Sequence, residues 1–105
     1  IISKAIQSTL KWFRHPYINQ VFMYETLSET DFNYSTQENF KPNTYVDISK
    51  YIERKVEAMN IYKSEINDFP FPRSVKAINA LAQLRGSQSG FEYAESFVKI
   101  FEKIC

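Results

Sequence analysis

The chain has 105 residues, and its 13 basic and 12 acidic side chains leave a formal net charge of +1. This length limits it to one domain at most, and its charges alternate along the chain without forming a basic block, so composition gives no support to nucleic-acid binding. No apolar run approaches the ~20 residues of a membrane span, and the single cysteine, Cys105, excludes an internal disulfide and a cysteine-built zinc cage. These features predict a soluble chain of the reducing cytoplasm, without a transmembrane segment.

The first predicted element is a helix at the very start of the chain. Its apolar stripe recurs at helical spacing, at Ile2, Ala5, Ile6, Leu10 and Phe13. The helix should end before the stretch RHPYIN, because Pro16 disfavours the helical conformation at the residue before it. No residue precedes the stripe to cap the helix, so we expect the chain to begin inside a helix of a longer domain.

Two short strands and a long loop are predicted next. Residues 20–25, QVFMYE, form an apolar and aromatic run that predicts a strand buried on both faces. Residues 26–43 are polar and have no apolar period, which predicts a long surface loop of the kind that is usually functional or disordered. Its rings would suit a sugar or a partner subunit if they are exposed; they are Phe32, Tyr34 and Phe40. Residues 43–48, NTYVDI, predict a second strand.

Two helices are expected in the second half of the chain. The first buries a face made of Ile48, Ile52, Val56 and Met59. Asp47 or Ser49 can cap it. After two prolines, Ser74 can cap the second helix, which buries Val75, Ile78, Leu81 and Ala82. Gly86, one of only two glycines, lies where this helix should stop, and we expect a positive φ there. The pattern after Phe97 does not distinguish helix from strand.

Several short motifs follow one another between Val21 and Phe97. They are Tyr-Glu at 24–25, Phe-x-Pro-Asn at 40–43, Val-Asp-Ile at 46–48, Lys55, Pro-Arg-Ser at 72–74, Arg-Gly-x-x-x-Gly at 85–90 and Ala-Glu-x-Phe at 94–97. In this order and spacing the stretch resembles the C-terminal half of the PIG-L/LmbE-like N-acetylglucosaminyl deacetylases. The resemblance implies an α/β fold, the C-terminal part of a Rossmann-like domain that is incomplete without upstream residues. It also implies a zinc-dependent hydrolase that removes the N-acetyl group from an amino sugar or glycoconjugate.

The metal site that the resemblance implies does not lie within the segment. In such enzymes two histidines and an aspartate usually hold zinc, which lowers the pKa of its bound water and polarises the amide carbonyl, and a neighbouring aspartate acts as the base. The family's His-Pro-Asp-Asp motif and its second histidine loop are absent, and the only histidine, His15, is followed by Pro16 and Tyr17 without a carboxylate. We interpret His15 as a helix-end or loop residue and expect the Zn²⁺ ligands upstream of Ile1.

Four residues are candidates for a substrate site. Glu25 follows a strand and could bind a sugar hydroxyl, or pair with a nearby Arg or Lys. Arg73 and Arg85 could anchor phosphate or sugar groups, although arginines near helix ends more often satisfy carbonyls or pair with acids. Tyr93 could offer its hydroxyl to the developing oxyanion, or could be a core residue of a strand. For Arg85 we favour a structural pair with Glu95.

Two classes of function follow from the sequence. The first is part of a zinc-dependent sugar N-deacetylase, whose partners would be an N-acetylated amino-sugar substrate and the missing N-terminal half of the same domain, with a homo-oligomer left open. The alternative is a non-catalytic helical module for protein–protein contact, which the amphipathic helices and the incomplete catalytic set favour. The residues that precede Ile1 would discriminate between them.

Overall fold

The computed structural model describes residues 2–27 and 39–104. Its elements, in chain order, are α1 (Ile2–Ser8), β1 (Gln20–Tyr24), β2 (Thr44–Asp47), α2 (Ile52–Ile61), α3 (Val75–Ser89) and β3 (Ala94–Glu102). The predicted order of helix, strand, strand, helix and helix is confirmed, and the tail after Phe97 belongs to a strand. The described chain therefore mixes helices with a small antiparallel sheet, in agreement with the α/β class in its general sense.

The sheet has the strand order β1-β3-β2, and β3 is antiparallel to both neighbours. β2 pairs with residues 94–97 of β3, whereas β1 pairs with residues 97–102, so Phe97 lies opposite both Tyr24 and Thr44. Asn43 strengthens this junction, since its N–H donates to the Phe97 carbonyl at 3.0 Å and its Oδ1 accepts the Lys99 N–H at 2.9 Å. The two outer strands thus occupy different halves of the central strand.

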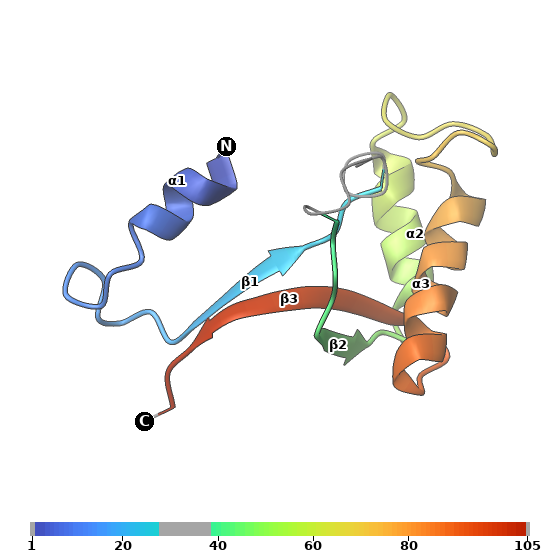
Figure 1. Ribbon diagram of the computed structural model, residues 1–105. Coiled ribbons are helices and arrows are strands. Elements are labelled where there is room, and N and C mark those ends of the chain that lie inside the picture. Colours follow the sequence, from blue (N-terminus) through green and yellow to red (C-terminus); the bar gives the residue numbers. More distant parts are fainter. Residues whose placement is uncertain (1, 28–38, 105) are drawn as a thin grey trace.

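Helices α2 and α3 lie side by side at the β2 end of the sheet, while α1 lies towards the β1 end (Figure 1). α3 packs against β3 and also contacts α2. Its buried face consists of Ile78, Ala82 and Gly86. The predicted apolar face of α2 is only half-buried at Ile52, Val56 and Met59. The core is therefore concentrated between α3 and the first residues of β3.

The burial on both faces that we predict for the first strand concerns the complete domain; within the described residues β1 stays partly exposed. β1 alternates between exposed and half-buried residues, and Tyr24 is 72% exposed. The reason is its position at the edge of the sheet, where β3 is its only strand neighbour among the described residues. A strand with one strand neighbour leaves part of its surface in solvent, and the burial of β1 in a longer domain stays a prediction.

α1 ends at Ser8, well before the stretch RHPYIN, so the last two residues of its predicted stripe, Leu10 and Phe13, lie outside it. Two hydroxyls explain the early end. Ser8 Oγ donates to the Ala5 carbonyl and Thr9 Oγ1 to the Ile6 carbonyl, each at 2.7 Å. Such side-chain bonds to the backbone compete with continuation of a helix, and a turn follows here instead.

Of the N-terminal caps predicted for α2 and α3, one is confirmed and the other is wrong. Ser74 caps α3 as predicted, because its hydroxyl accepts the Ala77 N–H at 3.1 Å. The predicted cap of α2 is wrong: the helix begins after Tyr51, with no side-chain cap. Asp47 instead accepts the N–H and the hydroxyl of Ser49, at 3.0 and 2.6 Å, and so forms a tight turn between β2 and the helix.

The roles of the two glycines also differ from the prediction. α3 continues through Gly86 to Ser89, and Gly90 takes the left-handed conformation with φ of 88°. Gly86 is required for a different reason: a Cβ at this position would lie 2.4 Å from the Phe91 carbonyl oxygen and 2.8 Å from that of Glu92. The chain therefore turns back onto the helix at Gly86, and Gly90 makes the turn.

Candidate functional site

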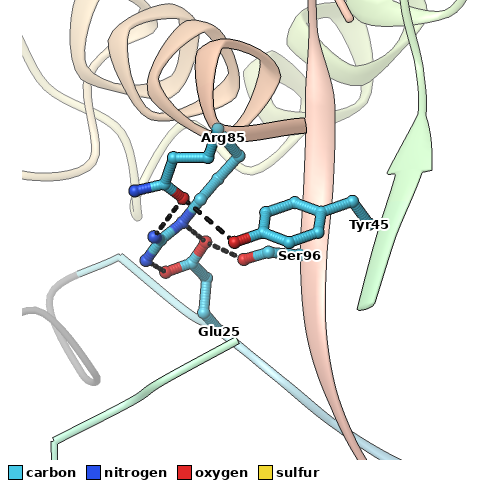
Figure 2. Close-up of polar contacts among 5 residues, drawn as sticks. Glu25, Tyr45, Arg85 and Ser96 are labelled. Carbon is cyan, nitrogen blue, oxygen red and sulfur yellow. Dashed lines mark hydrogen bonds and ion pairs between the residues drawn. The ribbon is translucent and has the colours of Figure 1, made fainter. Parts of the chain in front are cut away.

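Glu25 and Arg85 form an ion pair where the end of β1 meets α3. Arg85 Nε donates to Glu25 Oε1 at 2.8 Å and Arg85 Nη2 donates to Oε2 at 2.7 Å (Figure 2). The side chain of Arg85 is 13% exposed and that of Glu25 is 11% exposed. Two parallel hydrogen bonds between a guanidinium and a carboxylate give both strength and a fixed geometry. The interpretation of Glu25 as a partner of a nearby Arg is therefore confirmed.

Three more residues complete this site, which we call the Glu25 cluster: Glu25, Tyr45, Arg85, Gln88 and Ser96. Ser96 Oγ donates to Glu25 Oε1 at 2.7 Å (Figure 2). Gln88 Oε1 accepts from Arg85 Nη1 at 2.9 Å and from the Tyr45 hydroxyl at 3.3 Å. The cluster thereby joins the end of β1 and β2 to α3 and β3, which lie much later in the sequence.

The pKa of Glu25 lies below its ordinary value. Burial by itself raises this pKa, but hydrogen bonds from Arg85 and Ser96, together with the charge of Arg85, outweigh the effect of burial. The hydrogen bond to Glu25 likewise raises the pKa of Arg85. Within residues 2–27 and 39–104, no buried side-chain nitrogen or oxygen lacks a hydrogen-bond partner. The pair is thus charged and satisfied at neutral pH, which indicates a structural role for both groups.

The predicted pair between Arg85 and Glu95 is wrong. Glu95 Oε1 instead lies 3.3 Å from Lys55 Nζ of α2, and both side chains are partly exposed, at 39% and 33%. The reason is the two-residue alternation of a strand, because successive side chains point to opposite faces. Ser96 points towards Arg85, so the preceding Glu95 cannot.

Arg73 has partners of its own beside the Glu25 cluster. Its Nη1 lies 2.6 Å from Glu65 Oε2, and its Nε donates to the Leu27 carbonyl at 3.4 Å. Arg73 and Glu25 nevertheless line one hollow of about 150 Å³ beneath α2 and α3. The structure therefore brings two of the predicted substrate residues to the same cavity, each already paired with another group.

Tyr93 lies just before β3, outside the strand in which it was expected, and is half-buried. Its carbonyl accepts the Ile48 N–H at 2.9 Å, and its N–H donates to Ser49 Oγ at 3.2 Å. These bonds fix the backbone on which β3 starts. Tyr93 is not among the residues that line the hollow beside Glu25 and Arg73, so nothing in this geometry joins it to the other candidates.

A second hollow, of about 230 Å³, shares Glu25, Lys55 and Leu81 with the first. It lies between the Lys55–Glu95 pair and the Glu25 cluster, and the rings of Tyr24 and Phe97 form part of its lining. A larger hollow, of about 310 Å³, lies between α1 and β1, but its lining residues are apolar except for Gln7 and the hydroxyl of Tyr24. Acidic and basic groups therefore meet in a cavity at the junction of β1, β3, α2 and α3.

The described residues do not fit a zinc site. In the part of the chain that the structure describes, no three His, Cys, Asp or Glu side chains are placed so that they could hold a metal ion. His15 lies in the turns after α1, as expected of a loop residue, with its Nδ1 3.3 Å from the Tyr17 hydroxyl.

The aromatic residues predicted for the long loop are only partly described. Phe32 and Tyr34 lie outside the described residues, whereas the centre of the Phe40 ring is 6.0 Å from Cζ of the Arg85 guanidinium.

Sequence reasoning missed Ser96, Gln88 and Tyr45. The sequence could have pointed to two of them. Gln88 follows Arg85 by about one helical turn, which places the two side chains on one face of the helix, and Ser96 is the x of the Ala-Glu-x-Phe motif. The sequence held no such signal for Tyr45, since only the register of β2 on β3 brings it beside Gln88.

Comparison of the chain with protein-family models, with curated proteins and with solved structures found no match. Among residues 2–27 and 39–104, no helix combines the length and the apolar character that crossing a bilayer requires.

Proposed function

We propose that this chain is part of a zinc-dependent hydrolase that removes the N-acetyl group from an N-acetylated amino sugar or glycoconjugate. The sequence resemblance to PIG-L/LmbE-like deacetylases is its basis, and one structural observation supports it. The Tyr-Glu, Arg-Gly and Ala-Glu-x-Phe motifs, up to 71 residues apart, meet in the Glu25 cluster through Glu25, Arg85 and Ser96. Motifs that build one buried cluster have a physical reason to occur together, as expected if they belong to one folding unit.

In this proposal the segment contributes architecture and part of the substrate cavity. The Glu25 cluster fixes the end of β1 to α3 and β3, and so holds the wall of both hollows beside Glu25. Zinc, when bound, would supply an activated water and a polarised amide carbonyl. Because the described residues do not fit a zinc site, we assign its ligands and the catalytic base to residues upstream of Ile1, and we assign no step of the hydrolysis to this segment.

The same proposal covers the rest of the domain's fold and the cellular compartment in which the enzyme acts. Upstream strands would extend the small sheet into a Rossmann-like domain, and the enzyme would act in the cytoplasm as a monomer or a homo-oligomer. The exposed edge and exposed rings of β1 support this extension, because an unpaired strand edge can accept a further strand.

The test is an assay of the full-length natural protein. Zinc-loaded protein and chelator-treated protein are incubated with a panel of free, nucleotide-linked and lipid-linked N-acetylated amino sugars, and the released primary amine is measured. We expect amine release from at least one sugar, loss of release after chelation and recovery with zinc. No release from any sugar, or release that chelation leaves unchanged, would overturn the proposal.

A non-catalytic module for protein–protein contact is the alternative function. Its support is the exposure of rings near the N-terminal end, where Trp12, Phe13 and Tyr17 are each more than half exposed. Exposed apolar groups of this size are typical of contact surfaces. This alternative would be favoured if the full-length protein is inactive on every sugar and buries these exposed rings in an interface with another protein.

A further inference from the structure

The 230 Å³ hollow, which we call the Lys55–Glu95 hollow, has a composition that points to its ligand. Its walls come from four elements, and the side chains that matter here are Tyr24, Glu25, Lys55, Glu95, Ser96 and Phe97. Small-molecule sites typically begin at about 300 Å³. The Lys55–Glu95 hollow is somewhat smaller, so it suits one ring better than a chain of rings.

The two ion pairs at this hollow differ in their availability to a ligand. Glu25 is committed to Arg85 and Ser96 and is almost fully buried. Lys55 and Glu95 are one-third or more exposed, and a single contact of 3.3 Å joins them. An exposed pair of this kind holds its partners weakly, since water competes for both groups. Lys55 and Glu95 can therefore turn towards a ligand at little cost.

The charges around the hollow balance. The two carboxylates, Glu25 and Glu95, face the two cations, Arg85 and Lys55. An anionic ligand such as a phosphate would meet Glu95 together with Lys55, so the hollow offers it no net attraction. A neutral ligand that carries hydroxyls suits both groups, because a hydroxyl can accept from the ammonium and donate to the carboxylate.

The rings supply the remaining surface. Phe97 and the 72%-exposed Tyr24 lie beside the polar pair. Sites of this kind combine apolar and aromatic lining with a few polar groups that fix the orientation of the ligand. A sugar ring presents an apolar C–H face and a polar rim of hydroxyls, and these match the rings and the ion pair respectively.

We propose that the Lys55–Glu95 hollow binds one neutral N-acetylated hexosamine ring, with Lys55 and Glu95 on its hydroxyls and Phe97 and Tyr24 against its C–H face. The inference rests on the proposed function, since it names the place where that function would hold its sugar. It assigns to Lys55 and Glu95 a role in binding and none in hydrolysis.

The first test measures binding of N-acetylglucosamine to the full-length protein by calorimetry or ligand-observed NMR. Lys55→Met and Glu95→Gln should each raise Kd about tenfold, the range expected from loss of a hydrogen bond to a charged group. Lys99→Met is the matched control, because the Lys99–Glu102 pair has similar exposure on the same strand but lies outside the hollow. N-acetylglucosamine 6-phosphate should bind no more tightly than the neutral sugar.

A second test uses the unmodified protein, so it does not depend on the folding of a variant. Lysines are acetylated with an amine-reactive reagent, with and without saturating N-acetylglucosamine, and the modification of each lysine is measured by mass spectrometry. We expect the sugar to slow modification of Lys55 severalfold and to leave Lys99 unchanged. Equal rates at Lys55 with and without sugar would overturn the subsite.

The outcomes separate the subsite from the proposed function. Deacetylation that depends on zinc, with an unchanged Kd and KM in Lys55→Met and Glu95→Gln, retains the hydrolase and overturns the subsite. Sugar binding that depends on Lys55, in a protein without hydrolysis, retains the subsite and overturns the hydrolase. Tighter binding of the phosphorylated sugar through Lys55 would overturn the assignment of a neutral ligand.

Discussion

The two halves of the central strand β3 differ in what surrounds them (Figure 1). Residues 94–97 pair with β2 and are packed against α3, and the fully buried apolar side chains of the described chain lie around them: Ile48, Ile78, Ala82 and Ala94. Residues 98–102 pair with β1 alone, and Ile104 beyond them is 87% exposed. We call these halves the packed end and the open end.

The difference teaches that apolar composition and burial are separate properties in this chain. The open end is rich in large rings, yet Trp12 and Tyr17 are 72% and 75% exposed. The packed end relies on small residues such as Ala82, Gly86 and Ala94, which allow α3 to approach β3 closely. Burial follows from close packing of two elements, whereas a hollow of about 310 Å³ separates α1 from β1 at the open end.

The largest expected effect is at the packed end, at the Glu25–Arg85 pair. Arg85→Ala leaves a buried carboxylate without its partner, and we expect it to lower the free energy of unfolding by about 3–5 kcal/mol. Urea denaturation of the variants measures this loss. A double-mutant cycle should find coupling between Arg85 and Glu25 and none between Arg85 and Glu95.

Lys55→Ala is the control for the buried pair, since it breaks a pair that is partly exposed. Its expected cost is about 0–1 kcal/mol. Equal losses of unfolding free energy in Arg85→Ala and Lys55→Ala would contradict the distinction between the buried Glu25–Arg85 pair and the partly exposed Lys55–Glu95 pair.

The next largest effect is expected at Gly86. An added methyl group would meet backbone oxygens of residues 91 and 92 at 2.4 and 2.8 Å, and backbone cannot move aside as a flexible side chain can. We expect Gly86→Ala to cost about 1–3 kcal/mol through overpacking, measured as a shift of the denaturation midpoint.

Gly90→Ala is the matched control for Gly86. Nothing lies within 4 Å of the added Cβ at Gly90, so only the left-handed backbone, with φ of 88°, opposes the substitution. The expected cost is about 1 kcal/mol. A larger loss in Gly90→Ala than in Gly86→Ala would reverse the roles that the structure assigns to them.

Acid should lower the stability of the packed end by less than Arg85→Ala does, because protonation of Glu25 removes a charge but no atoms. The pKa of Glu25 is lower in the folded chain than its ordinary value of 4.5. The pair therefore contributes its full stabilisation above the unfolded pKa and loses it as the pH falls through the folded pKa. Denaturation midpoints between pH 7 and pH 3 should fall more steeply for the natural protein than for Glu25→Gln.

The pKa values of Asp47 and Glu102 are also lowered, the first by hydrogen bonds from Ser49 and the second by hydrogen bonds from Lys99 and Gln20. Both carboxylates remain in Glu25→Gln, so their contributions cancel in the comparison. Identical pH profiles for the two proteins would mean that Glu25 is not coupled to folding.

The smallest effect is expected at the open end. Trp12→Ala removes a ring that is 72% exposed, so stability of the 105-residue chain should change by less than about 0.5 kcal/mol. Thermal denaturation provides the measurement. A loss of about 2 kcal/mol in the full-length protein would instead show that another part of the protein covers this end.

The features that the sequence predicted correctly include several that depend on near neighbours, although the cap of α2 and the end of α3 were not among them. Ser74 caps α3 because its hydroxyl reaches an N–H only three residues away. The inward face of α2 follows from helical spacing. For Glu25 the sequence left two interpretations open, and the structure shows the pairing with an arginine. Each of these outcomes involves either local geometry or the chemical need of one group.

Only the tertiary structure decided which distant residues meet. Arg85 had two acids to choose from, and the alternation along β3 selected Glu25 by turning Glu95 towards Lys55. Gly86 is small because residues 91 and 92 return onto α3, a contact that no helical pattern encodes. The sequence alone thus determined the order of the local elements and the Ser74 cap of α3, because these depend on residue spacing and on a hydrogen bond a few residues long. The helix ends, the pairings and the exposure of each face depended on strand register and on which elements lie opposite one another.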